Sequence, residues 1–238
     1  MKKSLIIISS FILLNFSHCN TIKNIIGAPS QLEMIMALKE ALNQGLFRSF
    51  DAFAHPEGNP LVRFAFPGEA EKIERTLRNL GLDKKINEIT GKFNRAMFAA
   101  VNVSRPLFTD AVKNMSFRDA VSILITDNTH AATDYFKSEM KPGMIAGFRP
   151  IVDSTVKLEG ADKDWRTIAK TYNEIPFLNT PRLEESLTDF ISARIIDFMF
   201  MTVANEEEQI RTKYEFRKTD LMRKVFGYAE EELKRRKS

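Results

Sequence analysis

A helix start signal and a helical apolar repeat stand together in Ser30–Phe50, SQLEMIMALKEALNQGLFRSF. The first residue and Glu33 have the Ser-x-x-Glu spacing of a capping box, in which each side chain satisfies a backbone N–H of the first turn. Apolar residues then recur at spacings of three and four, which puts them on one helical face. They are Leu32, Ile35, Leu38, Leu42, Leu46 and Phe50. The stretch therefore predicts an amphipathic helix that packs through this face.

Two more helical patterns follow directly. Gly81, a residue suited to the left-handed conformation that ends helices, closes a pattern that begins at Glu69. Asp83 can then cap a helix whose apolar residues continue at helical spacing to Met97. The short connection between the two patterns predicts antiparallel helices.

Two brief helices are expected next. Ser104 precedes Pro106 as in the first turn of a helix, and Ser116 precedes Asp119 in a second short capping pattern. These signals predict helices that separate near Met115.

The rest of the chain continues the helical pattern. Asp127 or Asn128 can start a helix, Leu187–Met201 is apolar enough to predict a helix at the buried centre, and Thr219 opens a final helix. Only Val62–Phe66 has a strand-like pattern. The predicted fold class is therefore all-α, a single multi-helix, bundle-like domain.

The amino terminus has the pattern of a secretory signal. Lys2 and Lys3 precede the apolar stretch Leu5–Leu14, and polar residues follow from Asn15. The apolar stretch is about ten residues long, whereas a transmembrane helix needs about 20. We therefore expect the chain to be exported to the periplasm or the cell envelope.

Cys19, the single cysteine, lies where the signal would end. One prediction for it is bacterial lipidation of a mature amino-terminal cysteine, which would anchor the protein to a membrane. The other is removal with the signal, because Phe16, Ser17 and His18 replace the small residues that usually precede a lipidated cysteine. A single thiol cannot form an internal disulfide, so the core alone must stabilise the fold.

The charge balance excludes a nucleic-acid footprint. The 35 Lys and Arg against 31 Asp and Glu give a formal charge of +4, which falls to +2 when Lys2 and Lys3 leave with the signal. The basic run Lys234–Lys237 fits a solvated helix end whose cations suit the helix dipole, with contact to a membrane surface or a polyanion as the alternatives. The expected divisions are a signal peptide at 1–19, a flexible segment at 20–30, the helical domain at 31–227 and a basic helix end at 228–238.

Several sequence blocks, in order, resemble the bacterial domain-of-unknown-function family 4197. The blocks are Leu38–Gly45, Phe93–Ala96, Met115–Leu124, Ala131–Phe136, Glu207–Arg211 and Thr219–Gly227. The resemblance implies a helical, signal-bearing envelope protein, frequently a predicted lipoprotein, with no established activity, cofactor or catalytic residue. The chain departs from the family pattern at Phe98, where the family has a carboxylate after its Asn-Arg pair.

Polar residues within these blocks are candidates for a ligand site if the fold brings them together. Arg95 could hold a carboxylate bidentately, either that of a ligand or that of Asp119, Asp197 or Glu207. A structural ion pair is the favoured interpretation of such an arginine. The candidate ligand-binding residues are Asn94, Arg95, Asp119, Thr133, Tyr135 and Asp220.

A weaker pattern concerns metal binding. Asp127, His130 and Asp134 share one helical face and could offer oxygen, nitrogen and oxygen ligands to a divalent metal. A helix cap, an exposed imidazole and a surface carboxylate explain the same residues without a metal. Since only His55 and His130 remain after signal removal, a multi-histidine zinc centre is excluded. No metal or cofactor is therefore expected.

The acidic run Glu206–Glu208, with Arg211, could supply a general acid if two carboxylates were buried together. A solvated helical face is the simpler expectation, because Glu207 and Arg211 stand at the spacing of an exposed ion pair. No nucleophile-and-base pattern, phosphate-binding glycine loop or metalloprotease helix accompanies the run. An enzyme is therefore the minority interpretation.

The chain holds 19 Phe against one Trp and four Tyr. Most of these rings must form the core, although a bundle lined by them could leave a cavity for an acyl chain. The sequence thus favours an exported binding or structural protein whose partner is an envelope protein or a hydrophobic ligand. The alternatives are a lipid-binding protein and an uncharacterised enzyme with a site around Asn94 and Arg95.

Overall fold

The computed structural model describes residues 27–56, 62, 71, 74–75, 78–79, 81, 83–117, 119–174, 182 and 186–238. These residues form helices and contain no strand, which confirms the all-α fold class. No helix within the described ranges has a stretch long and apolar enough to cross a bilayer. The helices are α1 (Gln31–Ala54), α3 (Asp83–Asn114), α4 (Ala120–Leu124), α5 (Ala131–Leu158), α6 (Asp162–Asn173), α7 (Leu187–Thr212), the 3-10 helix η3 (Tyr214–Phe216) and α8 (Asp220–Lys237).

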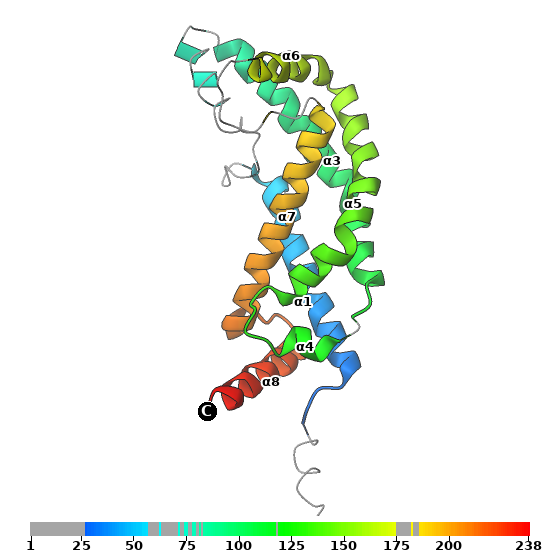
Figure 1. Ribbon diagram of the computed structural model, residues 1–238, viewed down its shortest axis with the longest axis vertical. Coiled ribbons are helices and arrows are strands. Elements are labelled where there is room, and N and C mark those ends of the chain that lie inside the picture. Colours follow the sequence, from blue (N-terminus) through cyan, green and yellow to red (C-terminus); the bar gives the residue numbers. More distant parts are fainter. Residues whose placement is uncertain are drawn as a thin grey trace, which may run out of the picture.

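The four long helices, α1, α3, α5 and α7, form an antiparallel bundle (Figure 1). Helix α3 packs against α5 and α5 against α7, and α1 closes the ring, packing more extensively against α7 than against α3. Helix α6 lies across one end of the bundle, whereas α4 and α8 lie at the other end (Figure 1). Helix α8 also packs against α1.

The helix starts follow the capping signals of the sequence. Ser30 Oγ accepts the Glu33 N–H at 3.2 Å, while Glu33 Oε2 accepts the Ser30 N–H at 2.8 Å, so the predicted capping box is present. Thr219 caps α8 by accepting the Met222 N–H at 3.1 Å. Asp119 caps α4 through its side chain. Each contact satisfies a first-turn donor that has no partner within its own helix.

The backbone carbonyl groups at the end of α7 accept hydrogen bonds from the side chain of a residue that follows the helix. Arg217 is 3% exposed and donates to the carbonyl oxygens of Ile210 and Arg211 at 2.9 and 3.0 Å. The same guanidinium donates to Glu230 of α8 at 3.0 Å. Arg217 therefore closes the carbonyl end of α7 and fastens α8 to it.

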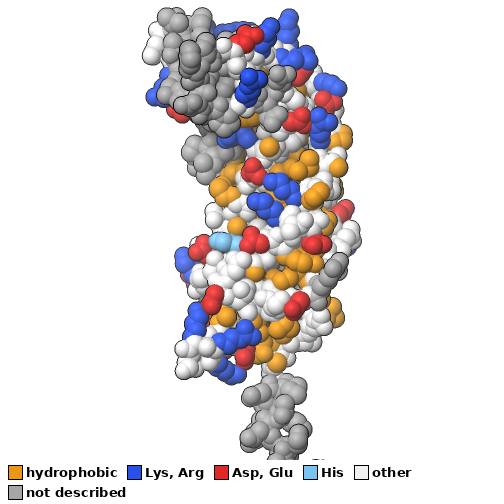
Figure 2. All heavy atoms as spheres, in the orientation of Figure 1, with side chains coloured by type: hydrophobic (Ala, Val, Ile, Leu, Met, Phe, Trp, Pro, Cys, Tyr) orange, Lys and Arg blue, Asp and Glu red, His pale blue; other side chains and the backbone are white. Residues whose placement is uncertain are grey.

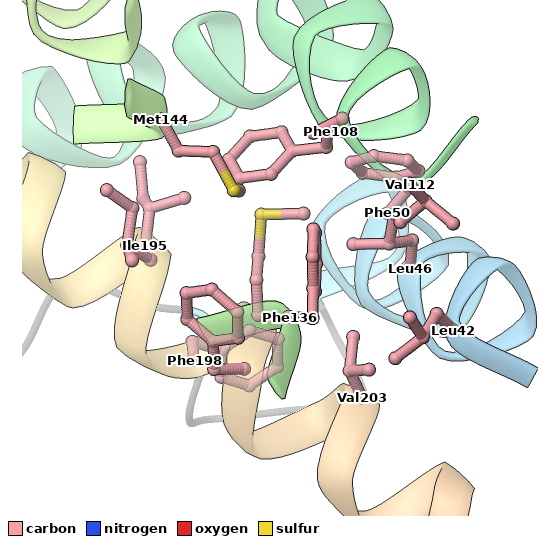
Figure 3. Close-up of a cluster of buried hydrophobic side chains, with 14 of the residues drawn as sticks. Leu42, Leu46, Phe50, Phe108, Val112, Phe136, Met144, Ile195, Phe198 and Val203 are labelled. Carbon is pink, nitrogen blue, oxygen red and sulfur yellow. The ribbon is translucent and has the colours of Figure 1, made fainter. Parts of the chain in front are cut away.

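Apolar side chains from all four long helices meet inside the bundle (Figure 3). Phe108 stands near the middle of this core, with its ring edge-on to Phe50 at 6.2 Å and to Phe148 at 5.6 Å between centroids. On α7, Ile191 and Ile195 are fully buried, as predicted for the central helix, whereas Met201 is 43% exposed. The predicted packing role of the phenylalanines thus holds for the rings at the centre of the bundle.

Helices α1 and α7 approach each other closely at Gly45. A Cβ atom at this position would lie 2.7 Å from the Cα atom of Val203. Because real Cβ atoms do not approach a backbone atom so closely, only glycine fits the present spacing of the two helices. Gly45 therefore sets how tightly α1 packs on α7.

The predicted helix start at Ser104 is wrong, because α3 runs without interruption from Asp83 to Asn114, whereas the predicted separation near Met115 is confirmed. Phe108 and Val112 are fully buried on the same helix, and their burial outweighs the one hydrogen bond that a proline removes. The Ser104 hydroxyl bonds back to the Val101 carbonyl instead of capping a new helix. The second expected helix exists as α4.

Some predictions fall outside the described residues. They are the signal peptide, most of the expected strand Val62–Phe66 and most of the helical pattern that precedes Gly81. Within the described part, Val62 is buried, and Gly81 has the left-handed φ of +81° that the sequence predicts for a helix end.

Candidate functional site

The structure separates the six polar residues proposed as a ligand site. Arg95 donates to Glu159 at 2.8 Å, a partner beyond the end of α5 that the sequence did not suggest. Thr133 lies at the opposite end of the same helix. The rise of about 1.5 Å per residue puts the two ends of α5 about 40 Å apart. Asn94 and Arg95 therefore cannot share a cleft with Thr133.

The remaining candidates have local structural contacts. The Tyr135 hydroxyl donates to the Ser116 carbonyl at 2.7 Å, and its ring stacks on Phe117 at 5.2 Å. Asp220 pairs with Arg223 at 2.7 Å, and its side chain is 98% exposed. With Asp119 capping α4, these residues hold turns and helix ends and do not converge on one site.

The candidate metal ligands also point to other partners. Asp127 pairs with Lys237 at 2.6 Å, His130 Nδ1 lies 3.1 Å from the Ala204 carbonyl oxygen, and Asp134 accepts from the Asn128 amide at 2.9 Å. Among the residues that the structure describes, no group of three or more His, Cys, Asp and Glu is placed to hold a metal ion.

A buried carboxylate from the acidic run Glu206–Glu208 joins α7 to α5. Glu207 is fully buried and accepts the backbone N–H groups of Ala132 and Thr133 at 2.9 and 2.7 Å, together with the Thr133 hydroxyl at 2.7 Å. His130, the N-cap residue of α5, makes no side-chain cap bond. Glu207 therefore caps α5 from a neighbouring helix, where the helix dipole favours a negative charge.

Arg211 completes this buried centre. Its guanidinium pairs with Glu207 at 2.8 Å and donates to the carbonyl oxygens of Ile123 and Leu124 at 2.9 Å each, and it lies over the Phe226 ring at 5.7 Å. The ion pair thus ties α4, α5, α7 and α8 together, with every strong donor and acceptor engaged.

The expected solvated face is therefore wrong at Glu206 and Glu207, which are 8% and 0% exposed. A signal for this was present in the sequence. Glu207 stands four residues after Val203 and three before Ile210, so helical spacing puts it on the same face as two apolar residues.

An open groove of about 890 Å³ runs along the outward face of α1 from Glu40 to His55. Arg105 of α3 borders it, and Lys218, Thr219 and Met222 close the end next to α8. Phe47 projects into solvent within the groove and is 62% exposed. The groove thus combines an exposed ring with amide, carboxylate and cationic groups.

The carboxylates around the groove already have partners. Glu40 accepts the Thr219 hydroxyl at 2.5 Å, and Asp51 lies 3.2 Å from His55 Nδ1. Beneath the groove, Glu206 accepts from Gln44 at 2.7 Å and lies 3.7 Å from Arg48. These contacts fix the acidic groups of the groove in place.

Arg105 differs from the other charged groups of the groove. Its guanidinium lies over the Phe50 ring at 5.1 Å. Its Nε atom is buried and has no hydrogen-bond acceptor among the described residues. A buried N–H without an acceptor is rare in folded proteins and identifies Arg105 as a group that can still bind an anion.

A sequence model of the family described as "Protein of unknown function (DUF4197)" matches residues 28–227. The chain belongs to this family. No curated protein and no solved structure matches the DUF4197 chain. The matched range extends from the capping segment of α1 into α8 and so includes the groove and the buried Glu207 centre of this DUF4197 protein.

Four of the six sequence blocks that carried the resemblance meet in two pairs in the DUF4197 structure. Ala131–Phe136 and Glu207–Arg211 meet at the buried carboxylate, which is a structural joint closed to solvent. Leu38–Gly45 and Thr219–Gly227 meet through Glu40 and Thr219, at one end of the open groove. The groove is therefore the candidate functional site.

Proposed function

We propose that this DUF4197 protein is an exported binding protein that recognises a partner through the groove on α1. The observation that carries the proposal is the Arg105 Nε atom, which is buried at the edge of an open groove without an acceptor. An anionic group entering the groove would meet the Arg105 guanidinium, which borders it. The exposed Phe47 ring would lose its contact with water in the same event, which favours binding.

The groove supports binding better than catalysis. Its two carboxylates are bonded to Thr219 and His55, and the Thr219 hydroxyl itself accepts the Met222 N–H as the cap of α8, which gives this pair a structural role. The sequence-based alternative of an enzyme site at Asn94 and Arg95 has less support, because Arg95 is paired with Glu159. The alternative of an internal lipid cavity also has less support, because the described cavities are open at the surface.

Surface charge agrees with a partner other than nucleic acid. On the face seen in Figure 2, cationic and anionic side chains are interspersed, and apolar side chains lie along its middle. A protein that neutralises a phosphate backbone needs a continuous surface of positive charge. The interspersed charges of this face and the small net charge of the chain support a protein or small-molecule partner.

Export is part of the proposal and rests on Lys2, Lys3 and the apolar stretch Leu5–Leu14. The intact mass of the protein purified from its native envelope tests it. A chain that lacks the first residues supports export, and an acylated amino-terminal Cys19 would add membrane attachment. A full-length chain confined to the cytoplasm would overturn the proposal for localisation.

Site-specific photocrosslinking tests the binding face. We would replace Phe47 with p-benzoylphenylalanine and irradiate living cells, using the same replacement at Leu158 as the control. Leu158 is 84% exposed at the far end of α5, outside the groove. We expect a specific adduct from position 47 and none from position 158. Equal adduct patterns at both positions, or no adduct at either, would overturn the proposed binding face.

A further inference from the structure

We infer that the groove on α1 receives an α-helical segment of a partner protein and that an Asp or Glu of this segment binds Arg105. The inference rests on the proposed function and adds the chemistry of the partner. Three observations carry it: the unsatisfied guanidinium, the mixed polarity of the groove and the position of α8 on α1.

The Arg105 Nε–H group has no hydrogen-bond acceptor among the described residues, so a partner has to supply one. Arg105 Nε is buried, while Glu40 and Asp51, the carboxylates of the groove, are bonded to Thr219 and His55. A carboxylate matches the fork of a guanidinium and can accept two parallel N–H groups. The Phe50 ring against the same guanidinium holds it in place for such a partner.

The mixed polarity of the groove favours a polypeptide over an acyl chain. Phe47 and Ala54 offer apolar contact, but Asp51 lies between them and Asn43 precedes them on the same groove. A hydrocarbon chain would remove these polar groups from water without replacing their hydrogen bonds, which is costly. The side chains of a helix can supply apolar contact and hydrogen bonds at alternating positions.

The geometry of the groove matches helix packing. Its lining positions on α1, such as Glu40, Asn43, Phe47 and Asp51, recur at spacings of three and four, as in the ridges against which helices pack. Helix α8 already packs on the preceding part of α1, where Lys224 pairs with Glu33 at 2.6 Å. The groove continues beyond α8 for about 22 Å along the α1 axis, which suits a helix of about 15 residues.

The charges of the groove favour an acidic partner. Arg48, Arg105 and Lys218 border it, and the side chain of Arg48 is 55% exposed. Arg48 is paired with Glu206, whereas Arg105 Nε has no acceptor among the described residues, so Arg105 remains available to a partner. A helix with acidic residues facing Arg105 and Lys218 would therefore match the groove in charge.

The test combines crosslinking with charge-removing substitutions. p-Benzoylphenylalanine at position 47 would be irradiated in cells that carry otherwise wild-type protein, Arg105→Gln or Arg95→Gln, and the attached peptide would be sequenced by mass spectrometry. Arg95 is the matched control because it lies on the same helix and is paired with Glu159. We expect attachment to a helical segment with an acidic residue, and a loss of about tenfold in adduct yield with Arg105→Gln, as for one charged contact. Arg95→Gln should leave the yield unchanged.

A second measurement uses the segment so identified as a synthetic peptide. The peptide and its variant with the acidic residue replaced by its amide would be titrated into purified wild-type and Arg105→Gln protein. We expect the amide to weaken binding to wild-type protein and to make no difference to Arg105→Gln. This double-mutant cycle measures the contact between Arg105 and the acidic residue of the peptide, even if Arg105→Gln alters the protein elsewhere.

The outcomes separate this inference from the proposed function. A position-47 adduct whose yield is the same with Arg105→Gln would overturn the carboxylate contact and leave the binding face standing. An adduct with the mass of a lipid or fatty acid would overturn the helical partner in favour of an amphiphile. No adduct at position 47 would overturn both proposals.

Discussion

The carboxylate of Glu207 accepts both the backbone N–H and the hydroxyl of Thr133, each at 2.7 Å. An acidic side chain from α7 thus provides the cap that α5 lacks in its own sequence. Arg211 balances the charge from one turn further along α7. The start of α5 therefore depends on a residue about 75 positions away in the chain.

Replacing Glu207 with Gln should destabilise the protein severely. The substitution leaves Arg211 buried without its counter-ion and weakens the cap of α5, and breaking a buried pair in this way costs about 3–5 kcal/mol. Urea unfolding followed by circular dichroism measures the change. The neighbouring Glu208→Gln is the control and should change the free energy of unfolding by less than about 0.5 kcal/mol. Equal effects of the two substitutions would contradict a structural role of the Glu207 carboxylate.

Two glycine substitutions should have opposite effects. Gly45→Ala places a Cβ 2.7 Å from Val203 Cα and forces α1 and α7 apart, with an expected cost of about 1–3 kcal/mol. Gly143→Ala, within α5, meets no atom within 4 Å and should stabilise the protein by about 0.4–1 kcal/mol. Thermal unfolding of both variants compares them directly. A neutral Gly45→Ala would mean that the α1–α7 contact is looser than the structure shows.

Acid should weaken the contact between α8 and α1. The Lys224 ammonium, followed by the Ser30 N–H and hydroxyl, lowers the pKa of Glu33 from 4.5 to about 2. Because the folded pKa is the lower one, the stabilisation is present above pH 4.5 and is lost as the pH falls from 4.5 to about 2. The difference in urea midpoint between wild type and Glu33→Gln should therefore shrink over this range. Glu139→Gln, an exposed substitution on α5, controls for the loss of one negative charge.

Arg217→Met should loosen α8 before it affects the rest of the bundle. The substitution removes the donor to the Ile210 and Arg211 carbonyls and the ion pair with Glu230. We expect the free energy of unfolding to fall by about 2 kcal/mol or more. Hydrogen exchange should accelerate in α8 and change little in α3 and α5. Arg235→Met, at an exposed ion pair on α8, should leave the exchange pattern as in wild type. Uniform acceleration throughout the bundle would argue against a local role.

Helices were predictable where the signal is local. The capping box at Ser30 and Glu33, the cap at Thr219 and the apolar face of α7 follow from residues within a few positions of one another. The continuous α3 was not predictable from Ser104 and Pro106, because burial of residues further along the helix decides whether a proline is tolerated.

The candidate site was less accessible to sequence reasoning. Glu207 was expected in solvent because its spacing to Arg211 also fits an exposed pair, and only the position of α5 makes it a cap. Arg105 was not singled out at all. Its significance depends on Phe50 from another helix and on the absence of an acceptor among the described residues, and neither has a sequence signature.

The ring of long helices has a consequence for how the protein folds. Three of its four helix–helix contacts join long helices that follow one another along the chain, so their connections are much shorter than the chain between α1 and α7. The fourth contact, between α1 and α7, joins the two ends of the bundle sequence and can form only after most of the intervening chain has folded. We therefore expect contacts at Gly45 and Val203 to be absent from the transition state, so that Gly45→Ala accelerates unfolding and leaves the folding rate nearly unchanged. The close approach of α1 and α7 at Gly45 would then determine how long the folded protein lasts.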